Sequence, residues 1–120
     1  MEEKELKDRT KRFALRVIRL VSALPRSQLS RVLGGQLLRA GTSVGANYRA
    51  ACRARSMADF ISKLGIVVEE VDETSYWMEL MVESKLVKEN RMREIMREAG
   101  ELTAIFTSSI LTAKNHHSKI

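Results

Sequence analysis

The sequence has few of the residues that build disulfide frameworks, metal knuckles, turns or membrane spans. Its 120 residues include one cysteine, one proline and six glycines, and only 5% are aromatic. The single cysteine, Cys52, excludes an internal disulfide and any CxxC motif. No apolar run approaches the roughly 18–20 residues of a membrane span, and the first residues lack the plan of a signal peptide. We therefore expect a cytoplasmic protein that does not contact the membrane.

Catalytic and metal-binding patterns are equally scarce. The two histidines, His116 and His117, lie near the C-terminus, far along the chain from the carboxylate pairs Glu69/Glu73 and Glu79/Glu83. A di-iron bundle needs a Glu-x-x-His motif on each of two helices, and no GxxxxGK or GxGxxG phosphate loop occurs. The sequence predicts no catalytic residue, no metal site, no cofactor and no enzyme activity.

Long stretches without turn residues predict four helices in one domain, residues 1–120. We expect them at about 3–24, 28–54, 57–86 and 91–114, followed by a polar, frayed tail at 115–120. Pro25 ends the first helix, the spacing of Ser56 and Asp59 resembles a capping box for the third, and Asn90 is the expected cap of the fourth. Short connections make consecutive helices antiparallel, so the fold class is all-α, an up-down four-helix bundle.

Apolar residues recur at intervals of three and four in each predicted helix, which indicates the buried face. In the second helix this face begins at Leu29 and includes Asn47, whose amide needs a hydrogen-bond partner if buried and is a candidate for fixing helix register. The expected seam of the third helix is Met57, Phe60 or Ile61, Leu64, Val68, Val71, Ser75, Met78 and Val82.

Four glycines in the second helix, Gly34, Gly35, Gly41 and Gly45, each cost about 1 kcal/mol relative to alanine. Close approach of a neighbouring backbone is one explanation. A break in the helix near Gly34 and Gly35 is the other.

Charge is polarised along the chain. The net charge is +6, but residues 10–58 hold ten basic side chains and no acidic one, whereas residues 59–120 hold eleven acidic and eight basic side chains. This asymmetry indicates an anionic partner, either nucleic acid or an acidic protein surface.

Eight arginines form two stripes at helical spacing. The first helix contributes Arg9, Arg12, Arg16 and Arg19, and the second contributes Arg31, Arg39, Arg49 and Arg53. Because consecutive antiparallel helices are neighbours, the stripes are expected to form one basic surface. The guanidinium fork suits phosphate, so we expect this surface to bind the RNA or DNA backbone. In the alternative interpretation these arginines pair with acids of the third and fourth helices, within the chain or between subunits of a self-assembling scaffold.

One motif is specific enough to indicate a family. It reads Ser-[Val/Ile]-x-Ala-Asn and then Arg-x-Ser-x-x-Asp-Phe, and the matching positions are Ser43, Val44, Ala46, Asn47, Arg55, Ser56, Asp59 and Phe60. In this respect the sequence resembles the four-helix-bundle proteins encoded in intervening sequences of bacterial 23S ribosomal RNA genes, over most of residues 10–110. Many relatives have Glu two residues after the asparagine, where this chain has Arg49.

The resemblance implies a small cytoplasmic bundle that assembles as a homopentamer and has no known enzymatic activity. A related branch is the accessory protein of diversity-generating retroelements, a basic pentameric barrel that works with a reverse transcriptase and nucleic acid. The partners implied are therefore further copies of the chain, RNA or DNA, and, for that branch, a reverse transcriptase.

Overall fold

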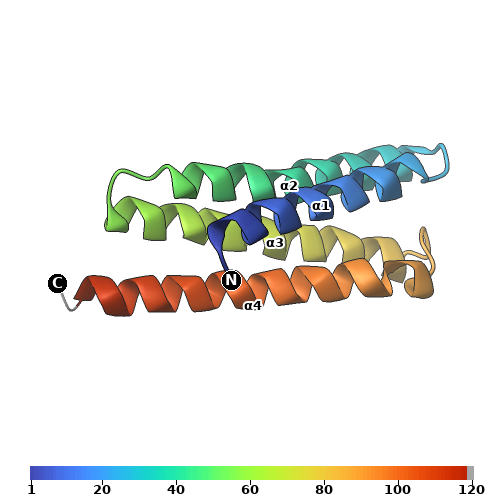
Figure 1. Ribbon diagram of the computed structural model, residues 1–120. Helices are drawn as coiled ribbons and strands as arrows, with labels where there is room; N and C mark the ends of the chain where they lie inside the picture. The colour runs from blue at the N-terminus through green and yellow to red at the C-terminus, as the bar shows by residue number, and fades with distance from the viewer. Residues whose placement is uncertain (119–120) are drawn as a thin grey trace.

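The computed structural model describes residues 1–118, which form an all-α bundle of four antiparallel helices (Figure 1). The helices are α1 (Glu3–Ser22), α2 (Gln28–Cys52), α3 (Met57–Glu83) and α4 (Glu89–Ser118). They make an elongated molecule of 53 × 21 × 20 Å. The predicted fold class is confirmed.

The helix ends differ from the prediction by a few residues. Three helices end earlier than expected, at Ser22, Cys52 and Glu83, where short backbone turns such as Ala23 N–H to the Arg19 carbonyl complete the last turn. The fourth begins at Glu89, so Asn90 lies inside the helix instead of capping it. Helix α4 also continues through 115–118, which were expected to fray. The last two residues of the expected tail, 119–120, lie outside the described residues.

Serine caps define the starts of α2 and α3. The Ser27 side chain accepts a hydrogen bond from the Ser30 N–H at 3.0 Å, and the Ser56 side chain accepts one from the Asp59 N–H at 3.0 Å. Each cap satisfies one of the backbone donors that an α-helix leaves unpaired at its start. The predicted cap at Ser56 is confirmed.

The core runs the length of the bundle around Phe13, Leu37, Leu64 and Phe106, all at most 1% exposed. The seam of α3 differs from the heptad prediction, because it buries Val67, Thr74 and Met81 fully and leaves Val68, Ser75 and Val82 half-buried. A helix that packs against both α2 and α4 buries a broader face than a coiled-coil seam. Leu29 was expected in the core, but it lies in the first turn of α2 and is 45% exposed.

Helix α2 continues unbroken through Gly34 and Gly35. A Cβ at Gly34 would lie 3.1 Å from Leu24 Cδ1, one at Gly41 would lie 2.8 Å from Val17 Cγ2, and one at Gly45 would lie 3.0 Å from Thr10 Oγ1. Close approach of α1 therefore accounts for three of the four glycines. Gly35 has nothing within 4 Å of that position, so packing does not explain it.

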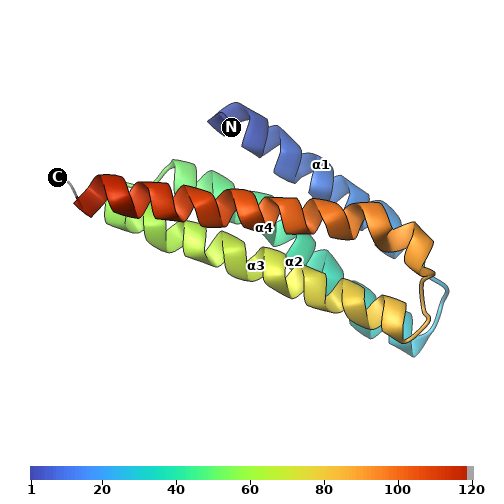
Figure 2. The same ribbon diagram turned by 90° about the horizontal axis from the view of Figure 1, so that it is seen from below.

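Helix α1 is the least embedded of the four. It packs along α2 but meets α4 over only a short stretch, and Figure 2 shows it diverging from α4 towards its N-terminus. Because α1 has 20 residues and α4 has 30, the C-terminal part of α4 extends beyond the cover that α1 provides.

No helix among the described residues is both long and apolar enough to cross a membrane.

Candidate nucleic-acid interface

The first arginine of the α1 stripe is held by α4. The Arg9 guanidinium donates from Nε to Glu98 Oε2 and from Nη2 to Glu98 Oε1, both at 2.7 Å, and Nη2 also lies 3.1 Å from Glu101 Oε1. The side chains of Arg9 and Glu98 are each only 18% exposed. Hydrogen bonding to Arg9 holds the pKa of Glu98 below its usual value and raises the pKa of Arg9 further. Arg9 therefore joins α1 to α4 and has little capacity left for phosphate.

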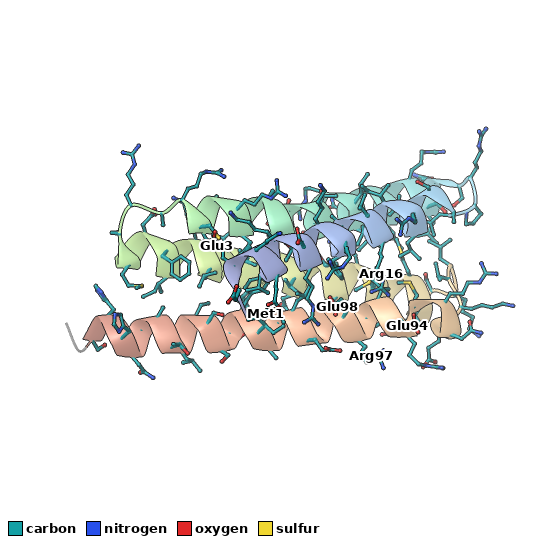
Figure 3. The ribbon with its side chains drawn as sticks, viewed as in Figure 1. Met1, Glu3, Arg16, Glu94, Arg97 and Glu98 are labelled. Atoms are coloured by element: carbon teal, nitrogen blue, oxygen red, sulfur yellow. The ribbon has the colours of Figure 1, made fainter. Side chains whose placement is uncertain are left out.

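Arg12 and Arg16 lie on the same side of α1, next to this pair. Together with Arg9 they line an open hollow of about 470 Å³ that also includes Asp8 and Glu98. Figure 3 shows Arg16 and Glu98 between α1 and α4. The positive charges of Arg16 and Arg12 contribute, after Arg9, to the low pKa of Glu98. Among the described residues neither arginine forms an ion pair with a carboxylate, and Arg19 continues the stripe as an exposed side chain.

Among the four arginines predicted on α2, Arg39 forms ion pairs with acidic side chains. Its Nη1 lies 3.3 Å from Glu70 Oε2, and its Nη2 donates to Glu73, which also accepts from Trp77 Nε1 at 3.3 Å. These hydrogen bonds raise the pKa of Arg39 and lower that of Glu73. Arg39 thus faces α3, on the opposite side of α2 from α1.

The remaining arginines of α2 are exposed on its outer side. Arg49 lines a groove of about 290 Å³ between α1 and α2, which includes Lys7 and Lys11 and whose lining contains no acidic side chain. Arg31 lines a second hollow with Arg26 at the α1–α2 connection. Arg53 caps the C-terminal end of α2 and is exposed.

The eight arginines consequently do not form the single surface expected from the sequence. The prediction that α1 and α2 are neighbours is confirmed, but Arg9 faces α4 and Arg39 faces α3. The α1 stripe lies on the α4 side of its helix, whereas Arg31, Arg49 and Arg53 lie on the outer side of α2.

Three basic residues that complete these surfaces were not selected from the sequence: Lys7, Lys11 and Arg26. Lys7 and Lys11 are four residues apart and share the side of α1 that faces the groove. That spacing is present in the sequence, but a pattern of arginines alone does not include it. Lys7 also pairs with Glu3 at 3.2 Å.

The family-motif residues have local structural roles. Ser43 Oγ donates to the Arg39 carbonyl at 2.6 Å, and Asn47 Nδ2 donates to the Ser43 carbonyl at 2.8 Å. Asn47 is half-buried, and the hydrogen-bond partner that its amide was expected to need lies within its own helix. A backbone acceptor one turn away already satisfies its donor.

At the start of α3 the motif supports the helix end. Asp59 pairs with Lys63 at 2.8 Å, and this hydrogen bond lowers the pKa of Asp59. Phe60 is half-buried against the core, and Arg55 is exposed in the α2–α3 connection, where its backbone and charge also lower the pKa of Asp59.

Two comparisons with known proteins agree with each other and with the observed four-helix fold. A family model described as 23S rRNA-intervening sequence protein matches residues 2–108. The chain is also similar to the crystal structure of a protein of unknown function from the S23 ribosomal protein family of Bacteroides thetaiotaomicron. That similarity has 37% identity and a TM-score of 0.85, and it covers 92% of this chain and 98% of the other. No curated protein matches the chain.

Proposed function

The chain belongs to the 23S rRNA-intervening sequence protein family, and from this membership and its surface charges we propose that it is a non-enzymatic, cytoplasmic, self-associating protein that binds the backbone of RNA or DNA. The arginines of α1 and α2 that lack an acidic partner provide the contacts. Self-association into a homo-oligomer, with a pentamer as the state that the resemblance implies, is part of this proposal.

One observation carries the nucleic-acid part. Six arginines form no ion pair among residues 1–118: Arg12, Arg16, Arg19, Arg31, Arg49 and Arg53. Arg9 and Arg39 each contact two carboxylates, so the six differ from them in forming no ion pair within the part of the chain that the structure describes. Phosphate oxygens accept the bidentate hydrogen bonds that a guanidinium offers.

Binding of this kind is independent of base sequence. The two aromatic side chains of α1 and α2, Phe13 and Tyr48, are at most 5% exposed, so these helices offer no platform on which bases can stack. Contacts made by arginine to phosphate alone position a duplex or strand without reading it. We therefore expect similar affinity for unrelated sequences of equal length.

The test is the salt dependence of RNA binding in the variant Arg12→Gln/Arg16→Gln/Arg19→Gln. Each phosphate contact contributes about 0.7–0.9 to the slope of log K against log salt concentration. The variant should therefore bind RNA more weakly at low salt and with a flatter slope than the wild type. Unchanged affinity and slope would overturn the proposal.

A matched control removes the same charge from another surface. The variant Arg91→Gln/Arg93→Gln/Arg97→Gln neutralises three exposed arginines of α4. It should keep the wild-type slope, because these residues lie outside the proposed interface. An equal loss in both variants would mean that net charge alone governs binding, which contradicts a localised site.

The scaffold alternative has an observation of its own in its favour. Arg9 and Arg39 pair with carboxylates, and four exposed acids of α3 form no ion pair among the described residues: Glu69, Asp72, Glu79 and Glu83. If arginines of α1 serve only to hold subunits together, the α1 triple variant changes the sedimentation mass. Under the nucleic-acid proposal it keeps that mass.

A further inference from the structure

The outward face of α3 combines acidic and apolar side chains. Ile66 and Tyr76 are 41% and 52% exposed, and both are large for a surface position. Acidic residues follow the same face at intervals of three, seven and four, which keep them on one side of a helix: Glu69, Asp72, Glu79 and Glu83. The face is thus an acidic strip with two apolar anchors.

The outer face formed by α1 and α2 has the complementary character. The residues that line the groove at its centre include three small ones, Ala14, Gly45 and Ala46. Basic residues stand around it: Lys7, Lys11 and Arg49. One turn further along the same faces lie three large apolar side chains, Leu15, Ile18 and Leu38, which are 41%, 40% and 36% exposed.

Exposed apolar clusters rimmed by charge mark interaction sites. Ala14 and Ala46, which line the groove from α1 and α2, allow the helix of another molecule to come close, because neither side chain is longer than a methyl group. An apolar floor and a basic rim suit a helix that carries apolar anchors and acids. A phosphate backbone would use the rim but would leave Leu15, Ile18 and Leu38 exposed.

These two faces do not meet within one chain. Helix α1 packs on α2 and α4, and α3 packs on α2 and α4, so α1 and α3 occupy diagonal positions in the bundle (Figure 1). The outward face of α3 therefore points away from the α1–α2 groove. A contact between them needs a second molecule.

We propose that α3 of one copy docks in the α1–α2 groove of the next copy. Ile66 and Tyr76 pack on the apolar floor, and the α3 acids pair with Lys11 and Arg49 on the rim. The proposal rests on the self-association included in the proposed function and names the surfaces that produce it.

The two surfaces are different, so the contact is heterologous. Each added copy presents another groove and another α3 face, and growth ends only when a ring closes. This contact covers Lys7, Lys11 and Arg49, so in the assembled protein Arg49 pairs with acids of α3 and no longer belongs to the arginines proposed for phosphate. Arg12 and Arg16 line the hollow on the α4 side of α1 and stay available for phosphate.

The test uses two variants that each damage one surface. Lys11→Glu/Arg49→Glu gives the groove an acidic rim and leaves α3 intact. Ile66→Asp/Tyr76→Asp removes the apolar anchors of α3 and leaves the groove intact. All four side chains are at the surface, so neither variant opens the core, and circular dichroism verifies the helix content.

Light scattering should give the wild-type chain an oligomeric mass and each variant alone a monomeric mass. An equimolar mixture should form a 1:1 dimer and grow no further, because only one intact groove and one intact α3 face remain per pair. The control Val32→Asp/Leu111→Asp changes two side chains of similar exposure, 55% and 58%, outside both faces. It should keep the wild-type mass.

The failures are distinguishable. A monomeric wild-type chain overturns the self-association of the proposed function and this interface with it. An oligomeric wild type whose groove and α3 variants keep their mass overturns this interface alone, as does a mixture that stays monomeric. A groove variant that keeps its mass but loses binding to a single-stranded RNA probe assigns the groove to nucleic acid and also overturns the proposal.

Discussion

The Arg9 guanidinium and the Glu98 carboxylate form a two-pronged ion pair between α1 and α4, with both N–O distances at 2.7 Å. This long-range contact lies in the N-terminal half of α1, the part of the helix that diverges from α4 (Figure 2). Paired guanidinium and carboxylate groups in this geometry are among the stronger polar contacts in proteins. The pair therefore links α1 directly to α4, in addition to the apolar packing of α1 on α2.

Replacing Arg9 with Gln should destabilise the protein by about 1–3 kcal/mol, because Glu98 is then left partly buried without its cation. A double-mutant cycle with Glu98→Gln isolates the pair, and we expect a coupling of about 0.5–3 kcal/mol between the two sites. Urea unfolding followed by circular dichroism measures all four stabilities. Strictly additive effects of the two substitutions would show that the pair contributes no more than an ordinary surface contact.

The same pair makes stability depend on pH. Since Arg9 lowers the pKa of Glu98 in the folded protein relative to the ordinary value of 4.5, the unfolded chain takes up a proton at a higher pH than the folded one. The stabilisation is complete well above pH 4.5 and is lost as the pH falls through the lowered folded pKa. The difference in unfolding free energy between wild type and Glu98→Gln should therefore be constant between pH 7 and about 6 and shrink below pH 4.5. A difference in unfolding free energy that stays constant down to pH 3 would contradict this prediction.

Sequence periodicity was sufficient for the fold because the helices are long and their boundaries are marked. Pro25, the Ser56 cap and the absence of other breakers define four segments. The spacing of residues such as Phe13, Met92 and Phe106 identifies their buried sides. The predicted buried face was wrong for α3, which packs against two neighbouring helices. Helix α3 buries Val67 and Met81, which a single heptad seam assigns to the surface.

The candidate site was less predictable, since charge spacing shows which residues share a side of a helix but not what that side faces. Arg9 and Arg12 belong to the same stripe, but of the two only Arg9 forms an ion pair with Glu98. That difference depends on the angle at which α1 crosses α4, which long-range packing sets. The same applies to Arg39, whose acids are 31 and 34 residues away in the chain.

Ser56 should be important for the start of α3. Its side chain accepts from the Asp59 N–H at 3.0 Å, and Ser56→Ala leaves that donor without a partner from the protein, at a cost of about 1 kcal/mol. Ser56→Asp keeps an acceptor at the cap and should retain most of the stability. Ser62→Ala, at an exposed position of the same helix, is the matched control and should change the unfolding free energy by less than about 0.5 kcal/mol. Equal effects at both serines in thermal unfolding would show that the cap is not used.

Replacement by alanine is predicted to have opposite effects on stability at two glycines of α2, Gly41 and Gly35. Val17 is fully buried, and its Cγ2 and Cγ1 atoms would lie 2.8 and 2.9 Å from a Cβ at Gly41. Because a β-branched side chain packed in the core has no room to turn aside, Gly41→Ala should destabilise by about 1–3 kcal/mol despite the better helix propensity of alanine. At Gly35 a Cβ meets nothing within 4 Å, so Gly35→Ala should stabilise by about 0.4–1 kcal/mol.

The steric origin of the Gly41 effect can be tested with Val17→Ala, which removes the two Cγ atoms. That variant is destabilised by its own cavity, but adding Gly41→Ala to it should cost less than adding Gly41→Ala to the wild type. Chemical denaturation of the four proteins gives this coupling. If Gly41→Ala costs the same in both backgrounds, Val17 is not the obstacle. In that case the close approach of α1 to α2 at this point would not explain why α2 carries a glycine there.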